Sequence, residues 1–144
     1  MIEVVNRQRR RALDVDGWRE FAERALRVIG GKQERQRGAT VAFVSDRVMR
    51  DLNRRFRGRR GTTDVLSFPA GPVEFEGAAD DSLGDVVISI ERAEAQAVEN
   101  NLSFEQEVKQ LILHGLLHLC GYDHVTDNGE MNALELRLRR RLGI

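Results

Sequence analysis

All three histidines of the chain lie within eleven consecutive residues, from His114 to His124. His114 and His118 are four residues apart in an apolar stretch typical of a buried helix, so their imidazoles share one helix face, a turn apart. Gly121 can adopt a positive φ and end this helix, which lets the chain turn back and bring His124 to the same point. Three imidazoles with a vacant fourth position describe a catalytic rather than a structural zinc site. We therefore predict one Zn²⁺ per chain, held by His114, His118 and His124.

The single cysteine, Cys120, is not expected to be a fourth ligand. It follows His118 by two residues, about 200° around the helix, and so points away from the other ligands. One cysteine excludes an internal disulfide and is typical of a reducing compartment. No apolar run approaches the roughly 18 residues of a membrane helix, and the first residues lack the layout of a signal peptide. We expect a cytoplasmic protein that does not enter membranes.

The histidine stretch resembles the signature of a known family. His114-Gly-Leu-Leu-His118-Leu-Cys-Gly121-Tyr-Asp-His124 is similar, at every fixed position, to the H-G-x-x-H-L-x-G-y-D-H signature of the YbeY family, bacterial endoribonucleases involved in rRNA maturation. The spacing also resembles the H-E-x-x-H-x-x-G-x-x-H signature of metzincin proteases. Gly115, however, stands where those enzymes carry the glutamate that takes a proton from zinc-bound water. The family resemblance implies RNA cleavage, and the bare spacing leaves a small metallopeptidase or amidohydrolase as an alternative.

A positively charged loop follows the second predicted helix. Five of the seven residues from 54 to 60 are arginines, which would concentrate a phosphate backbone, although so short a run is usually only solvated surface. Residues 52–69, with the sequence Leu-Asn-Arg-Arg-Phe-Arg-Gly-Arg-Arg-Gly-Thr-Thr-Asp-Val-Leu-Ser-Phe-Pro, resemble a segment of the same family, in which Arg57 aligns with the arginine that the family uses in catalysis. The resemblance implies that Arg57 binds and stabilises the scissile phosphate. We expect Arg59 and Arg60 to bind substrate beside it.

Three aspartates neighbour these motifs and are candidates for a general base or for orienting a ligand histidine, namely Asp64, Asp85 and Asp123. Asp85 belongs to a segment that resembles the family's L-G-D-[IVL]-x-I element, in which it would support the metal site; turn chemistry at a strand entrance is an equal alternative. For Asp123 we favour the orienting role. The sequence leaves open whether water or the RNA's own 2′-hydroxyl attacks the phosphorus.

The elements that must position these residues alternate as strand, helix, strand, helix, strand, strand and three helices. Strands are expected at residues 2–5, 40–44, 64–68 and 83–90, and helices after Asp16, after Ser45 or Asp46, at 91–99, after the capping box of Ser103 and Gln106, and after Asp127 or Asn128. This order predicts the α+β class, as one domain over residues 1–144, with a mixed four-stranded sheet covered by helices and a metzincin-like metal helix. The last two strands should pair antiparallel and the earlier ones parallel. Pro69 suits an edge position for the 64–68 strand, whose exposed edge could hold an extended ligand.

Charge alone does not identify a partner, because 23 basic residues balance 23 acidic ones. All but two of the basic residues are arginines, which suit forked phosphate contacts, although an arginine-rich genome would give the same bias. The arginines at 137, 139, 140 and 141 are interpreted as a solvated carboxyl-terminal turn.

The family resemblance covers much of residues 52–124 and implies the partners. These would be single-stranded RNA, precursor rRNA and the small ribosomal subunit, with a role at the 3′ end of 16S rRNA and in ribosome quality control. A zinc-stabilised, ribosome-associated RNA-binding factor without chemistry of its own is a further alternative. We expect the protein to be a monomer.

Overall fold

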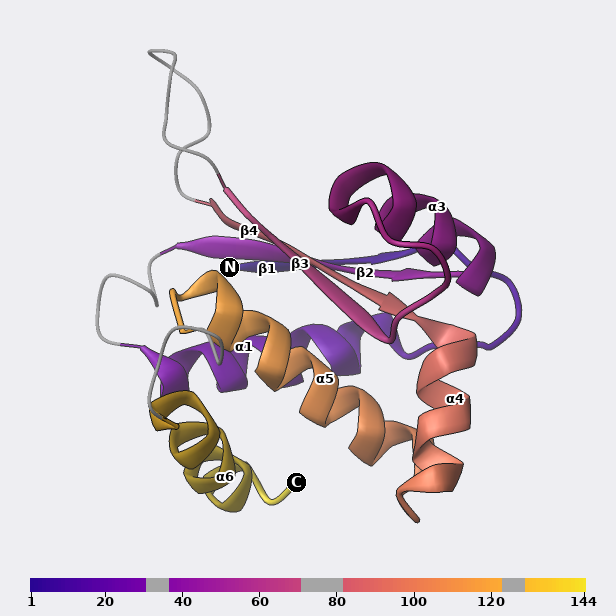
Figure 1. The fold of residues 1–144 in the computed structure, drawn as a ribbon. Coiled ribbons are helices and arrows are strands. Elements are labelled where there is room, and N and C mark those ends of the chain that lie inside the picture. Colours follow the sequence, from indigo (N-terminus) through magenta and orange to yellow (C-terminus); the bar gives the residue numbers. More distant parts are fainter. Residues whose placement is uncertain (31–36, 71–81, 123–128) are drawn as a thin grey trace.

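The computed structural model of the protein describes residues 1–30, 37–70, 82–122 and 129–144 (Figure 1). The strands are β1 (Ile2–Asn6), β2 (Gly38–Val44), β3 (Val65–Pro69) and β4 (Ser82–Ser89), and the helices are α1 (Val15–Ile29), α3 (Asp46–Arg57), α4 (Ile90–Glu99), α5 (Phe104–Leu119) and α6 (Glu130–Leu142). The predicted element order and the α+β class are confirmed. None of the described helices combines the length and the apolar character needed to cross a membrane.

The four strands form one mixed sheet in the order β1-β2-β4-β3. The β1–β2 and β2–β4 pairs are parallel, and β3 pairs antiparallel with β4, as the connections predicted. Pro69 ends β3 opposite Gly84, so the proline lies on an edge strand, where its missing N–H leaves no gap in a central ladder. The edge position of β3 is therefore confirmed.

The helices are divided between the two faces of the sheet (Figure 1). The helices α1, α4, α5 and α6 lie on one side, and α3 lies alone on the other. The strands match this division, because Val41 and Phe43 of β2 enter the larger buried cluster, while Val44 enters a smaller one with Met49 of α3. Both faces of the sheet therefore carry buried apolar residues.

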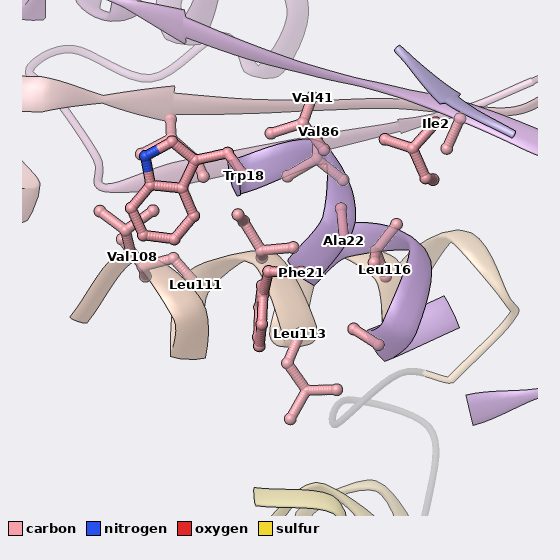
Figure 2. Packing of buried hydrophobic residues seen from close by; sticks show 14 of the residues in the cluster. Ile2, Trp18, Phe21, Ala22, Val41, Val86, Val108, Leu111, Leu113 and Leu116 are labelled. Carbon is pink, nitrogen blue, oxygen red and sulfur yellow. The ribbon is translucent and has the colours of Figure 1, made fainter. Parts of the chain in front are cut away.

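The larger cluster fixes α5 against the sheet (Figure 2). Trp18 and Phe21 of α1 lie beside Val108 and Leu111 of α5 in this view, with Val86 of the sheet above them. Each large apolar side chain that is fully buried contributes roughly 1.5–3 kcal/mol. The helix that carries the histidines is therefore held on one side by the sheet and on another by α1.

The ends of α5 follow the local signals in the sequence. Ser103 and Gln106 form the predicted capping box, in which each side chain accepts from the other residue's backbone N–H. At the other end Gly121 has φ 97°, and the N–H of Tyr122 donates to the carbonyl of Leu117 at 3.1 Å. This is the Schellman arrangement that a left-handed glycine allows. The predicted helix end at Gly121 is confirmed.

Two helix starts differ from the expected caps. The N-cap of α1 is Asp14, whose Oδ1 accepts from the N–H of Gly17 at 3.0 Å, and not Asp16, which lies in the first turn. Both aspartates suit a helix start, but only the earlier one has its carboxylate in reach of a free N–H. The last helix begins at Glu130 with Gly129 as its N-cap, later than expected, and residues 127 and 128 lie outside the described residues.

Candidate active site

His114 and His118 converge near the C-terminal end of α5. The Nε2 atoms of the two rings are 3.1 Å apart, and the ring planes cross at 73°. Two nitrogens bound to one tetrahedral zinc ion at the usual bond length lie about 3.3 Å apart. The pair therefore fits two ligands of a single metal ion.

The predicted third ligand, His124, lies outside the described residues, as does Asp123. Within residues 1–30, 37–70, 82–122 and 129–144, no group of three His, Cys, Asp or Glu side chains is placed to hold a metal ion. Gly121 and Tyr122, which precede the gap, line the same cleft as both histidines. The three-histidine site thus stays a prediction, and the fit to a metal rests on the His114–His118 pair.

A cleft of about 650 Å³ brings the arginine and the histidines together. Arg57, Asp64, His114 and His118 all line it, together with residues 65–67 and Pro69 of the edge strand β3. Arg57 reaches the cleft from the last position of α3, where Gly58, at φ 63°, ends the helix and turns the chain toward β3. The structure therefore places two regions more than fifty residues apart in sequence around one cavity.

Among the described residues, Asp64 is the predicted carboxylate that lines the cleft. Its Oδ1 accepts from the N–H of Val65 at 2.8 Å and from the hydroxyl of Thr63 at 3.3 Å. Its backbone carbonyl accepts from the N–H of Ser89, which ties the start of β3 to the end of β4. Asp64 also lines a second hollow of about 600 Å³, which shares His114 with the cleft. Asp64 is thus held where the cleft and this second hollow meet.

Asp85 is not brought to the histidines. It is exposed on β4 and stands opposite Phe68 of β3. Neighbouring residues of a strand point to opposite faces, and Val86 packs toward Gly115 of α5. Asp85 therefore faces the α3 side of the sheet, like Val87, which belongs to the smaller cluster there.

The arginine loop is also divided by the structure. Arg57 lines the histidine cleft, whereas Arg60 lines a different hollow, along α3, with Asp46, Asp51 and Glu91. Arg59 is exposed and is not among the residues that line the cleft. The density of arginines in the sequence indicated a basic surface. Which of these side chains lines the histidine cleft depends on where α3 ends, and that position is Arg57.

Gly115 is required by the close approach of α5 to the sheet. A Cβ at this position would lie 2.5 Å from Cγ1 of Val86 and 3.3 Å from Oγ of Ser67. The Ser67 hydroxyl donates to the Gly115 carbonyl at 3.2 Å. No side chain fits there without displacing the sheet, so the glutamate of the metzincin pattern has no room at residue 115.

A carboxylate from α6 contacts His114. Glu135 is only 5% exposed, and its Oε1 lies 2.6 Å from Nδ1 of His114. Its Oε2 accepts from Nη2 of Arg139 at 2.6 Å. The interpretation of Arg139 as part of a solvated turn is therefore wrong, because its side chain is 29% exposed and pairs with a buried carboxylate.

Sequence reasoning missed Glu135 and Tyr122. The four-residue spacing of Glu135 and Arg139 signals a helical ion pair, but nothing local points from Glu135 to a histidine 21 residues earlier. Tyr122 is 37% exposed and lines the cleft. Its position within the histidine motif is the sequence signal that could have indicated this.

Comparison with known proteins decides the family. The profile of the family described as Endoribonuclease YbeY matches residues 3–143. The chain belongs to the endoribonuclease YbeY family. Endoribonuclease YbeY of Clostridioides difficile (strain 630) is 45% identical over 109 residues, 73% of this chain and 71% of that protein. Endoribonuclease YbeY of Syntrophus aciditrophicus (strain SB) is 34% identical over 132 residues, 92% and 81% of the two chains.

A solved structure shares the fold of the chain. The solution structure of TM1509 from Thermotoga maritima matches with a TM-score of 0.67 at 27% identity, covering 99% of this chain and 89% of that one. The family resemblance drawn from residues 52–124 is thus confirmed and extends over nearly the whole chain. The YbeY fold accordingly includes β1 and α6, which lie outside the two sequence motifs.

Proposed function

We propose that this YbeY protein is a zinc-dependent endoribonuclease that cleaves single-stranded RNA, with His114, His118 and His124 as the metal ligands. The observation that supports it most directly is the cleft in which Arg57 and two convergent imidazoles meet. The RNA substrate comes from the endoribonuclease names of the family and its relatives.

The residues of the cleft have different roles in phosphodiester cleavage. A divalent ion bound there supplies Lewis acidity toward a phosphoryl oxygen. The guanidinium of Arg57 offers a planar fork of donors, which bind the scissile phosphate and offset the charge that builds on it. The edge of β3 runs along the cleft, where an extended strand of RNA can lie.

The proton acceptor depends on the nucleophile. Asp64 is the carboxylate among the described lining residues and can take a proton from an attacking hydroxyl; Asp123 stays a second candidate and is better suited to orient a ligand histidine. Attack by the 2′-hydroxyl leaves a 2′,3′-cyclic phosphate, whereas attack by water leaves a linear phosphate monoester. The end groups of the product therefore distinguish the two routes.

The role on rRNA rests on the family resemblance, and the cytoplasmic location rests on the single cysteine. We propose that the protein acts in the cytoplasm, as a monomer, on the 3′ end of 16S rRNA in the small ribosomal subunit and in ribosome quality control.

The experiment compares metal-loaded protein with variants at both sides of the cleft. Labelled single-stranded RNA and casein are offered to the wild type, His114→Ala, Arg57→Ala and the control Arg54→Ala. Arg54 is a matched control, because it lies one turn earlier on α3, pairs with Asp51 and lines the other hollow. Folding of each variant is checked by circular dichroism.

We expect RNA cleavage by the wild type and Arg54→Ala, none by His114→Ala, and a loss of about 100-fold or more in Arg57→Ala. Casein cleavage would favour the metallopeptidase alternative, which Gly115 opposes. RNA binding without cleavage in every variant would favour the non-catalytic factor. Equal cleavage by Arg57→Ala and Arg54→Ala would refute the role of Arg57.

A further inference from the structure

We propose that Glu135 is a positioning residue of the metal centre: its carboxylate fixes the tautomer of His114, and Arg139 fixes that carboxylate in turn. The proposal rests on the proposed function, because it assigns two residues of α6 to the metal site there. The contacts that carry it join His114 of α5 to Glu135 of α6, and Glu135 to Arg139 on the same helix; all three residues lie in the described part of the chain.

The first step concerns the proton on His114. The guanidinium of Arg139, 2.6 Å from Oε2, favours the ionised form of the Glu135 carboxyl group. An ionised carboxylate only accepts hydrogen bonds, so the short contact between Oε1 of Glu135 and Nδ1 of His114 places a proton on Nδ1. A neutral imidazole carries one N–H, and Nε2 is then left with its lone pair. This Nε2 is the atom that faces Nε2 of His118 at 3.1 Å. The carboxylate thereby selects the form of His114 that can bind a metal.

The second step concerns the carboxylate itself. Glu135 is buried, and each of its oxygens has its own partner, Nδ1 of His114 on one side and Nη2 of Arg139 on the other. Arg139 follows one turn later on the same helix, so α6 holds both residues in a fixed relation. A buried ion pair seldom stabilises a protein more than well-packed apolar residues of the same size would. A carboxylate at this position is therefore better explained by what it does to His114 than by stability.

The third step is a consequence for α6 as a whole. This helix is docked by the buried side chains of Met131, Leu138 and Leu142. Metal binding at Nε2 and the docking of α6 at Nδ1 act on the same imidazole ring. Two events that favour the same state of one group strengthen each other by the same factor. Metal loading should accordingly slow the opening of α6.

The chain offers a matched control for the carboxylate. Glu107 of α5 is also buried, at 3% exposure, but its Oε1 accepts from the side-chain amide of Asn100 at 2.9 Å instead of contacting a histidine. Arg140, exposed beside Arg139 on α6, is the control for the guanidinium. A merely structural role for Glu135 predicts the same outcome for both glutamates.

The test measures Zn²⁺ affinity by competition with a chromogenic chelator in Glu135→Gln, Arg139→Met, Arg139→Lys, Glu107→Gln and Arg140→Met. We expect a loss of about 10- to 100-fold in Glu135→Gln and Arg139→Met, and a smaller loss in Arg139→Lys, which keeps the charge. The Glu107 and Arg140 variants should stay within about twofold of the wild type. Thermal unfolding of the metal-free proteins verifies that each variant is folded.

Two readouts do not depend on catalysis. In metal-free wild type, ¹⁵N NMR of the imidazoles should show His114 protonated at Nδ1, and Glu135→Gln should show a mixture of tautomers. Hydrogen exchange across α6 should slow on adding Zn²⁺ to the wild type and slow less in Glu135→Gln. An unchanged tautomer together with unchanged affinity in Glu135→Gln would overturn the proposal. If the wild type binds no metal, the proposed function fails, while the tautomer measurement still decides the role of Glu135.

Discussion

Substitution of Gly115 by alanine tests how tightly α5 is set against the sheet. The added methyl carbon would lie 2.5 Å from Cγ1 and 3.0 Å from Cγ2 of Val86, whereas carbon atoms in contact sit about 3.5–4.0 Å apart. Val86 is fully buried, and its β-branched side chain is stiff at χ1, so it cannot easily turn away. The helix must therefore shift by about 1 Å, or the sheet must yield.

The expected magnitude follows from two opposing terms. Overpacking of a well-packed core costs about 1–3 kcal/mol, and an overlap this large belongs at the upper end. Alanine is better than glycine in a helix by about 1 kcal/mol. We expect Gly115→Ala to lower the free energy of unfolding by about 2 kcal/mol net. Ala133→Gly, on the exposed face of α6, measures the helix term separately and should cost about 1 kcal/mol.

A double-mutant cycle with Val86→Ala isolates the contact. Val86→Ala alone removes two buried methyl groups and should cost about 2 kcal/mol. In the double variant the methyl group of residue 115 occupies part of the vacated space, so the total loss should be about 1–2 kcal/mol instead of the additive 4 or so. Because residue 115 lies beside His114, Zn²⁺ affinity should fall in Gly115→Ala and recover in the double variant.

The assay is urea unfolding of the metal-free proteins at 25 °C, monitored by circular dichroism. If Gly115→Ala is as stable as the wild type, or if the two substitutions are simply additive, the glycine does not serve the close approach of α5, and this reasoning is refuted.

Three further substitutions test single contacts of the fold. Burial raises the pKa of Glu107 above its ordinary value of 4.5, so its protonated form favours folding at low pH and this contribution is lost as pH rises through the raised pKa. The stability of Glu107→Gln relative to the wild type should therefore increase from about pH 4.5 upward until Glu107 is ionised and then level off, and a difference independent of pH in urea unfolding would contradict this. Ser103→Ala removes the capping box of α5 and should cost about 1 kcal/mol while leaving Zn²⁺ affinity unchanged, since the cap lies at the opposite end from the histidines. Gly84→Ala should cost at least about 2 kcal/mol in the same assay, because Gly84 has φ 129° and its Cβ would collide with the backbone carbonyl of Phe68; a neutral result would show that β4 can relax there.

Local patterns predicted the parts of the site that lie within one element. The four-residue spacing of His114 and His118 places both imidazoles on one face of any helix, and Gly121 ends that helix wherever it packs. Pro69 likewise restricts β3 to an edge, because its missing N–H cannot be tolerated in a central strand. These signals depend only on residues that are close together in the sequence, so they can be recognised without the tertiary structure.

Asp85 and Arg60 were predicted at the site, but the structure places both away from the cleft, and the reason is the same for each. Asp85 was a site candidate from its motif, yet strand alternation directs it away from α5, and the face that α5 covers is a property of the packed sheet. Arg60 is three residues from Arg57 but lines another hollow, because the chain reverses at Gly58. A shift of one strand position or one turn changes which surface a side chain reaches.

The sequence by itself therefore predicted that His114 and His118 share one helix face, proposed Arg57 as their partner in the site, and identified the family. Only the tertiary structure decided that Arg57 shares a cleft with the histidines, that Gly115 is where α5 meets Val86, and that Glu135 is bonded to His114. The reason is that helix and turn signals act between neighbours in the chain, whereas the docking of α3, α5 and α6 depends on burial summed over the whole core.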